Sequence, residues 1–260
     1  MPEILEVETY RRTAARALAR EVVSVQADDA WFLKGGTQRE ELAVSLVGRR
    51  FGAARRRGKL LLLDVEAEAV LGLRFGMTGR LLVDGAAGIE RLEYSSDRDD
   101  PAWDRFGVTF ADGGTMVLRD PRRLGGVELD PDVERLGPDA WSIGLAGLRD
   151  VLGASTAPLK ARLMDQGRLA GMGNLLTDET LWRAALSPER EAGSLDTTEL
   201  RRLHRTLRRV LDDLAQRGGS HTGDLQASRR PGAGCPRDGA PLARSTVGGR
   251  TTYWCPAHQR

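Results

Sequence analysis

Residues 166–182, QGRLAGMGNLLTDETLW, decide the fold of the C-terminal half of the chain. Gly171 and Gly173 allow a close approach of the backbone, and Asn174 is expected to cap the helix that follows. The N-terminus of a helix offers unpaired N–H groups and a positive dipole end to anions such as phosphate. The stretch therefore predicts either a helix–turn–helix that clamps a phosphate or an ordinary helical corner.

Helical periodicity extends on both sides of this stretch. Apolar residues recur at helical spacing in three segments, TAPLKARLMDQGRL (156–169), NLLTDETLWRAAL (174–186) and LDTTELRRLHRTLRRVLDDLAQRG (195–218). Pro158 stands where the first turn of a helix tolerates proline, and Gly218 and Gly219 end the longest helix. The C-terminal half is therefore predicted to be helical as far as residue 218.

The N-terminal half has a different pattern. After a predicted amphipathic helix over residues 3–20, short apolar runs alternate with turns rich in Gly, Asp and Arg. The clearest predicted strands are LLLLDV (60–65), AVLGLRF (69–75), RLLV (80–83), FGVTF (106–110) and GTMVLRD (114–120), the first two joined by a tight hairpin. Residues 129–141 contain two prolines and four acidic residues and are predicted to be a linker.

The predicted fold class is α+β with several domains. Residues 1–130 are expected to form a β-sandwich or barrel that carries one N-terminal helix. Residues 131–218 are expected to form a helical domain, and residues 219–260 a β-hairpin of the zinc-finger kind.

Composition fits a water-soluble globular protein, because 40% of the 260 residues are hydrophobic and 29% are charged. The sequence contains no apolar run long enough for a membrane span and no secretory signal, so a cytoplasmic location is expected.

Residues 201–260 contain 12 Arg and Lys against 4 Asp and Glu, whereas the remainder contains 27 against 33. The basic C-terminal part indicates either a polyanionic partner or a solvated helix face.

Both cysteines lie near the C-terminus, within the pattern Cys235-x2-Asp238-x16-Cys255-x2-His258. Two pairs of this spacing around a short hairpin are typical of a zinc ribbon, and Asp and His are both zinc ligands. A structural disulfide is not expected in a cytoplasmic protein. The alternative is a finger that has lost its metal and is held by packing alone.

The extreme N-terminus offers a nucleophile. Removal of Met1 leaves Pro2 with a secondary amine whose pKa is roughly 8, so part of it is neutral near pH 7. A neutral secondary amine can attack C1′ of a deoxyribose, and Glu3 and Glu6 follow as candidate proton donors and acceptors. Many proteins begin Met-Pro-Glu, so this feature is weak when taken alone.

Together, these motifs resemble the bacterial formamidopyrimidine-DNA glycosylase and endonuclease VIII family. PEILEVETYRR (2–12) is similar to the start of that family, and QGRLAGMGNLLTDETLW to its helix–two-turn–helix signature. DPRRLGGVEL (120–129), LGPD (136–139) and GRTTYWCPAHQ (249–259) follow in the order found in the family. The resemblance covers essentially the whole chain.

The resemblance implies a base-excision repair enzyme, a DNA glycosylase with abasic-site lyase activity. Pro2 is then the Schiff-base nucleophile, Glu3 the general acid and base, and Glu6 its support. Lys59, in RRRGKLLLL, matches a lysine that reaches the phosphate beside the lesion; a surface lysine is the alternative. The implied partner is damaged double-stranded DNA bound by a monomer, and the implied cofactor is structural zinc.

Further residues are implied to grip the DNA around a nucleotide that has rotated out of the stack. Met77 resembles an inserted methionine, Arg122 an arginine that contacts the orphaned base, and Leu124 a second wedge. Ordinary core packing is the alternative for both wedges, and Arg123 is equally compatible with a structural role. Asn174 and Arg250 are similar to a phosphate-binding pair, to which Lys160 adds a contact.

Four departures from the family pattern bear on the substrate. Arg74 stands where histidine is usual, Leu124 replaces phenylalanine, and Asp238 and His258 replace two cysteines. The interval from Gly219 to Cys235 is short for a loop that closes over a flipped purine, and SHTGD (220–224) resembles the endonuclease VIII branch. The lesion therefore stays open among oxidised pyrimidines, ring-opened purines and bulkier adducts. A specialised glycosylase for bulky alkylated bases and a non-catalytic binder of damaged DNA are the alternative functions.

Overall fold

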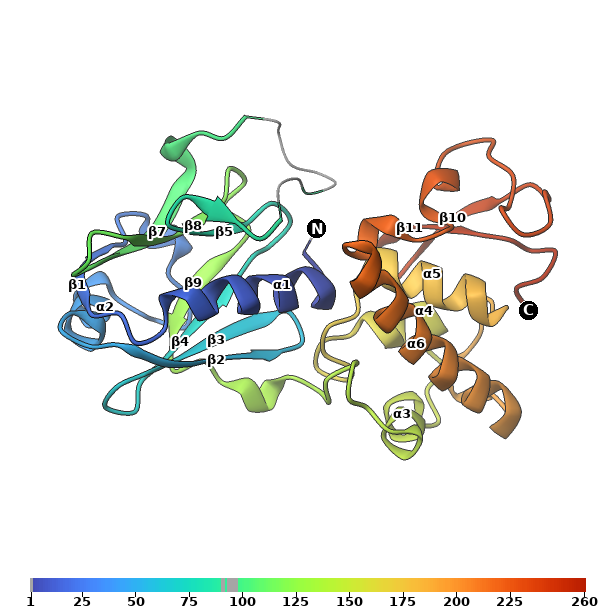
Figure 1. Ribbon diagram of the computed structural model, residues 1–260. Helices are drawn as coiled ribbons and strands as arrows, with labels where there is room; N and C mark the ends of the chain where they lie inside the picture. The colour runs from blue at the N-terminus through green and yellow to red at the C-terminus, as the bar shows by residue number, and fades with distance from the viewer. Residues whose placement is uncertain (1, 90–91, 93–97) are drawn as a thin grey trace. The chain divides into compact units, whose positions relative to one another are not determined.

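The computed structural model describes residues 2–89, 92 and 98–260, and Figure 1 gives the element labels used below. The chain divides into two compact units. Unit 1 comprises Pro2 and residues 6–133, and unit 2 comprises residues 3–5 and 134–260. Helix α1 (Ile4–Ala14) therefore begins in unit 2, where Ile4 and Leu5 are buried in the core, and continues in unit 1.

Unit 1 is built on two antiparallel sheets with a shared apolar core. The first sheet has the strand order β2 (Phe51–Arg57), β3 (Leu60–Val65), β4 (Val70–Arg74), β9 (Gly126–Leu129). The second has the order β1 (Val22–Gln26), β7 (Asp104–Phe110), β8 (Thr115–Arg119), β5 (Arg80–Val83), β6 (Ala86–Ala87). A further helix, α2 (Arg39–Leu46), lies between β1 and β2 in sequence.

The burial of the strands follows from their sequence pattern. Strand β8 alternates between buried and partly exposed residues, as expected for a strand with one face on the core. The LLLLDV run of β3 is buried except for half-buried Asp64, and Leu61, Leu63 and Val65 of one face belong to the shared apolar core. The shared core of the two sheets makes unit 1 a β-sandwich, which confirms that prediction over the barrel.

Unit 2 combines helices with a C-terminal hairpin. Its helices are α3 (Leu145–Leu152), α4 (Leu159–Met164), α5 (Asn174–Ala184) and α6 (Thr197–Arg217), and its hairpin pairs β10 (Ala243–Val247) with β11 (Arg250–Trp254). Asp196 caps the start of α6, and Gly218 ends it with a left-handed φ of 105°. Leucines at helical spacing bury one side of α6, among them Leu200, Leu203, Leu207, Leu211 and Leu214.

The remaining regular segments are short 3₁₀ turns, at Ala15–Ala17, Ala30–Phe32, Pro101–Trp103, Val133–Arg135, Ala192–Ser194, Ser220–Thr222 and Gln226–Ser228. None of the helices in the described residues combines the length and apolar character that a bilayer crossing requires.

Several predicted boundaries are wrong. The helix predicted over residues 156–169 is limited to α4, because the side chain of Asp165 accepts from the N–H of Gly167 and forms a turn. Helices α2 and α3, which are short, were not predicted. The hairpin and the helices of residues 134–260 belong to one compact unit. The division of the chain into three domains stays a prediction.

Candidate functional site

The side chain of Glu3 lies at the N-terminus of α5. Its Oε1 accepts a hydrogen bond from the N–H of Leu175 at 2.8 Å, and its Oε2 accepts one from the N–H of Leu176 at 3.2 Å. The side chain is fully buried. Two backbone donors and the positive end of the helix dipole therefore stabilise the ionised carboxylate.

The two glycines of the AGMGN turn make room for the N-terminal segment. A Cβ at position 173 would lie 2.2 Å from Cδ of Glu3, and one at position 171 would lie 2.6 Å from Cδ1 of Ile4. Gly171 also has a φ of 113°, and its carbonyl accepts from the N–H of Ile4 at 3.1 Å. The close approach predicted at these glycines thus occurs, and residues 3–4 of the chain itself make it.

Asn174 does not cap α5, contrary to the prediction. The N-cap position is taken by Gly173, which has no side chain, and Glu3 supplies the missing acceptor. Asn174 instead donates from Nδ2 to the carbonyl of Thr251 on β11, at 3.3 Å. Its side chain therefore joins the helix to the hairpin.

Lys160 was predicted to contact a phosphate. Its side chain is fully buried, so its ammonium does not reach a phosphate directly. Its Nζ lies 2.7 Å from Oδ1 of Asp178 and donates to Oγ1 of Thr252, also at 2.7 Å. Burial lowers the pKa of Lys160, and the charge of Asp178 opposes that change. Arg229 forms a second ion pair with Asp178, so the two carboxylate oxygens serve two cations. The buried ion pair and its hydrogen bonds join α4, α5 and β11.

The hairpin places Arg250 next to the hydrogen bonds that Asn174 and Lys160 make with β11. Asn174 and Lys160 both contact Thr251 or Thr252, the two residues that follow Arg250 on β11. Arg250 itself is exposed at the start of the strand, after a Gly248–Gly249 turn. Within unit 2, the structure thus groups Glu3, Asn174 and Arg250 around the N-terminus of α5 and the start of β11.

The candidate residues at the start of unit 1 lie on α1 and on the turn between β2 and β3. Glu6 is buried, and the pKa of Tyr10 is raised by burial and by the charge of Glu6. Lys59 follows Gly58 in the turn, and Nη1 of Arg56 donates to the carbonyl of Gly58 at 3.1 Å.

The same arginine ties this turn to α1. Nε of Arg56 lies 3.4 Å from Oε2 of Glu8, which also forms an ion pair with Arg11. Burial raises the pKa of Glu8, but the hydrogen bond and charge of Arg11 and the charge of Arg56 outweigh it, so the net pKa is lowered. Arg56 therefore fixes the position of the turn that carries Lys59.

Asp120 joins the two loops that carry Met77, Arg122 and Leu124. One carboxylate oxygen accepts from Oγ1 of Thr78 at 2.6 Å and from the N–H of Arg122 at 3.1 Å, and the other accepts from the N–H of Gly125 at 2.8 Å. Asp120 is fully buried. Asp120 was not predicted as a site residue, although it is the first residue of the DPRRLGGVEL motif.

The candidate wedge residues at the two loops differ in exposure. Leu124 is 51% exposed, which is high for a leucine and excludes ordinary core packing for this residue. Met77 is half-buried, and Arg122 is exposed. Arg123, with a φ of 56°, forms a bidentate ion pair with Asp29, and this supports its structural role.

The four predicted metal ligands come together at the base of the hairpin. The ligand atoms of Cys235, Asp238, Cys255 and His258 lie within 4.8 Å of one another. Nδ1 of His258 is 2.6 Å from Oδ2 of Asp238, and the hydrogen bond with His258 is the main cause that lowers the pKa of Asp238 to about 2. Nε1 of Trp182 donates to Sγ of Cys235 at 3.2 Å. Two sulfurs, one nitrogen and one carboxylate oxygen at this spacing fit a tetrahedral metal ion.

Comparisons with known proteins agree with this arrangement. The family model of the formamidopyrimidine-DNA glycosylase N-terminal domain matches residues 1–127, and that of the H2TH domain matches residues 136–225. The formamidopyrimidine-DNA glycosylase of Thermus thermophilus is 36% identical over 288 aligned positions, which cover 100% of this chain and 98% of the relative. That of Stenotrophomonas maltophilia is 32% identical, with 100% of both chains covered.

Solved structures are also similar over the whole chain. Lactococcus lactis Fpg with DNA that contains an abasic site has a TM-score of 0.84 and 27% identity, with 100% of both chains covered. The same protein with DNA that contains N7-benzyl-Fapy-dG has a TM-score of 0.83, with the same identity and coverage. The chain thus belongs to the formamidopyrimidine-DNA glycosylase family.

Proposed function

We propose that the protein is a base-excision repair glycosylase that removes damaged bases from duplex DNA and cleaves the strand at the abasic site. The observation that carries the proposal is the buried Glu3 carboxylate, held by the N–H groups of Leu175 and Leu176. Glu3 directly follows Pro2, so an acid–base group is fixed next to the amine of the N-terminal residue.

The chemistry begins with the neutral amine of Pro2. Its lone pair forms a bond to C1′, and the glycosidic bond breaks with its electrons leaving on the base, which takes up a proton. The Glu3 carboxylate then takes up the proton of the Pro2 nitrogen as general base, which restores a lone pair on that nitrogen. This lone pair forms the second C–N bond and the C1′–O4′ bond breaks, with O4′ protonated by Glu3 acting as general acid. An iminium between Pro2 and C1′ is left.

Strand cleavage follows from the iminium. It acidifies the C2′ proton, whose removal expels the 3′ phosphate in a β-elimination. A second, δ-elimination releases the 5′ phosphate, and water frees the sugar fragment from Pro2. Lys59, held on the turn that Arg56 anchors, contacts the phosphate beside the lesion and neutralises its charge.

Base excision requires the damaged nucleotide to leave the helix and its place to be filled. Exposed Leu124 and half-buried Met77 are apolar wedges for that gap, and Arg122 contacts the orphaned base. Asn174 and Arg250 bind the phosphates around the flipped nucleotide. Lys160 acts indirectly, since its buried contacts hold the hairpin on which Arg250 lies.

Zinc is the metal that the Cys235, Asp238, Cys255 and His258 set fits best, because the set combines thiolates with imidazole and carboxylate. When bound, zinc supplies structural cross-linking of the hairpin and no chemistry at the sugar. The indole N–H of Trp182 donates to Sγ of Cys235. The chain itself thus provides part of the second coordination sphere.

A substrate with a bulky alkylated base is a second candidate, favoured by the segment from Gly219 to Cys235. This segment contains the 3₁₀ turns Ser220–Thr222 and Gln226–Ser228. It is pinned to α5, since Glu179 accepts from the N–H groups of Asp224 and Leu225. A longer loop at this place would close over the flipped base. A short segment held against α5 leaves room for a bulky base instead.

A cleavage assay tests the function. The purified full-length protein is incubated with a set of duplexes. Each duplex contains one abasic site, 8-oxoguanine, ring-opened purine, oxidised pyrimidine or N7-alkylated purine. Cleavage of the abasic duplex together with at least one lesion duplex supports the proposal. Binding to abasic duplex without cleavage on any substrate identifies a non-catalytic binder and overturns it.

A further inference from the structure

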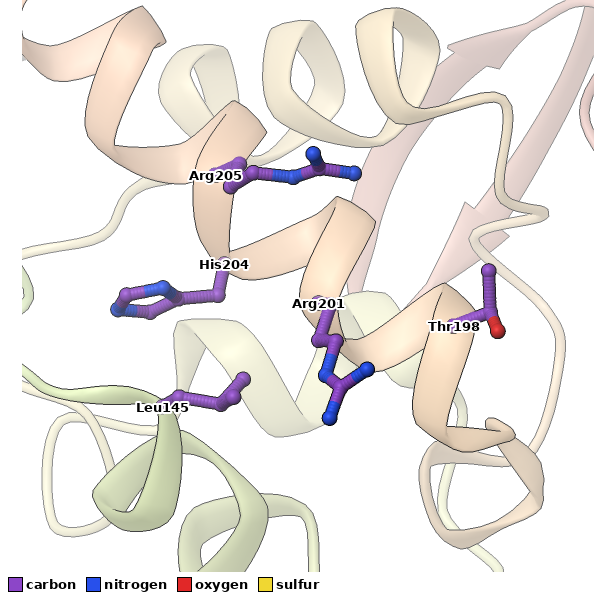
Figure 2. A pocket seen from close by; sticks show the side chains of 5 residues that line it. All are labelled: Leu145, Thr198, Arg201, His204 and Arg205. Atoms are coloured by element: carbon purple, nitrogen blue, oxygen red, sulfur yellow. The ribbon is translucent and has the colours of Figure 1, made fainter.

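Unit 2 contains a pocket that none of the candidate catalytic or DNA-binding residues lines. It is formed by Leu145 at the start of α3 and by four residues of the N-terminal half of α6, with a volume of about 480 Å³. The four are Thr198, Arg201, His204 and Arg205. Figure 2 shows the side chain of His204 extending from α6 on the side of Leu145, whereas those of Arg201 and Arg205 leave the helix in other directions.

The two arginines of the pocket have exposed and unpaired side chains. Among the described residues, the guanidinium of neither Arg201 nor Arg205 has a hydrogen-bond or ion-pair partner. Elsewhere in unit 2, Arg183 and Arg190 hold carboxylates at hydrogen-bond distance. Spacing of four residues on one helix sets Arg201 and Arg205 on the same face, so two unneutralised guanidinium groups share one concave surface.

The acidic side chains of α6 have partners outside the pocket. Glu199 binds Arg190 and the N–H of Asp196, and Asp212 accepts from Nε1 of Trp141 at 2.9 Å. At the pocket, α3 begins after Gly144, an N-cap residue with no side chain, so the positive end of this helix adds to the field. Nε2 of His204 is held 2.9 Å from the carbonyl of Ile143, and this fixes its ring as one wall.

The pocket lies on the side of unit 2 away from the hairpin. In Figure 1, α3 is at the bottom of unit 2, and β10 and β11 are at the top, with α6 between them. The hairpin carries Arg250, and its strand β11 accepts the hydrogen bond from Asn174. A partner in the pocket therefore leaves the candidate DNA-binding residues of this unit uncovered.

We propose that this pocket binds an acidic peptide segment of a partner protein, while DNA is held elsewhere. Two forked guanidinium groups one helical turn apart match successive carboxylates, and Leu145 offers apolar contact for one flanking side chain. A concave pocket of this size admits side chains of an extended peptide. The backbone of a duplex is convex and does not enter it.

Fluorescence anisotropy with the full-length protein tests the proposal. The probe is a short fluorescein-labelled peptide rich in Asp and Glu with two leucines, and the matched probe carries Asn and Gln in place of the acids. We expect binding of the acidic probe only, weakened about tenfold or more by the double change Arg201→Glu and Arg205→Glu, and weakened by added salt.

Arg208 and Arg209 provide the matched control. They lie on α6, are exposed and do not line the pocket, so the double change Arg208→Glu and Arg209→Glu alters the net charge equally. We expect this control to change affinity by less than about twofold, and cleavage of abasic duplex by both double variants to equal that of the unaltered protein. Equal losses in both variants, absent binding of the acidic probe, or weakened duplex binding by the pocket variant would each overturn the proposal. The outcome does not depend on the proposed catalytic function, because peptide binding is measured directly.

Discussion

The carboxylate of Glu3 caps a helix that lies more than 170 residues further along the chain, by accepting from the N–H of Leu175 at 2.8 Å and that of Leu176 at 3.2 Å. Gly173 permits this contact, because any side chain there would occupy the space of the Glu3 carboxylate. The capping contact and the proposed proton transfer thus depend on the same side chain. Its position is set by unit 2, although Glu3 follows Pro2 directly.

Glu3→Gln should separate catalysis from folding. Gln retains one acceptor oxygen for α5 but cannot deliver a proton, so the single-turnover rate on abasic duplex should fall about 10²–10⁴-fold. The unfolding free energy should fall by only about 1 kcal/mol, as for a weakened helix cap. Glu40→Gln, which removes an exposed charge from α2 outside the proposed chemistry, is the control. A variant that cleaves at the normal rate would remove Glu3 from the mechanism.

Asp120→Asn should slow base excision more than cleavage of a preformed abasic site. The N–H groups of Arg122 and Gly125 now donate to the carboxylate. The NH₂ group of Asn would face one of these donors and leave it without an acceptor, which lowers the free energy of unfolding by about 1–3 kcal/mol. That disturbs the loops of Met77 and Leu124, which matter most when an intact nucleotide must be displaced. Asp130→Asn, at an exposed carboxylate bonded to the N–H of Val70, should leave both rates unchanged. Equal slowing on both substrates would show that Asp120 serves stability alone.

Leu124 gives a test of the wedge. Leu124→Ala removes exposed apolar surface and should lower the excision rate on lesion duplexes about tenfold with little effect on thermal stability, since the side chain is half-exposed. Leu124→Phe adds an aromatic face that stacks on bases and should keep or raise the rate. The comparison is made by single-turnover kinetics with matched melting curves. Ala and Phe variants that behave alike would contradict a wedge at this position.

The metal site predicts about one zinc per chain by elemental analysis of freshly purified protein. Removal by a chelator should lower the melting temperature and change the fluorescence of Trp182, whose indole N–H donates to Cys235. Asp238→Ala should lose most of the metal, whereas Asp238→Cys should retain it, because thiolate is a good zinc ligand. Metal-free active protein would mean that packing alone holds the finger.

Acid should destabilise the N-terminus of α6. The hydrogen bond from Arg190 lowers the pKa of Glu199, and burial opposes this only in part. A carboxylate with a lower pKa in the folded state stabilises the fold above its unfolded pKa, and this contribution is lost as pH falls through the folded pKa. Melting temperature should therefore fall below about pH 4.5, and Glu199→Gln should flatten part of that fall. Glu189→Gln, at an exposed residue, should leave the pH profile unchanged.

The sequence predicted those elements whose signals are local. Helix α6 combines leucine periodicity, an Asp196 cap and a Gly218 stop, and the strands β3 and β8 have clear apolar patterns. Helix α3 was missed because it is short and begins after Gly144, which gives no capping signal. The four residues of the candidate metal site were predicted because their spacing repeats on either side of a single hairpin.

Contacts between distant segments explain the rest. The cap that Glu3 provides to α5, the link from Thr78 to Asp120 and the ion pair of Lys160 with Asp178 join segments that no local pattern relates. Asn174 was expected to cap because its residue type favours that position, but Glu3 supplies the acceptor and releases Asn174 for Thr251.

Borohydride trapping tests the central claim most directly. The protein is incubated with a duplex containing an abasic site in the presence of sodium borohydride, and the linked product is digested and mapped by mass spectrometry. The account predicts a covalent adduct on the nitrogen of Pro2, in a chain from which Met1 has been removed. An adduct on a lysine, or cleavage activity in a chain that retains Met1, would contradict it.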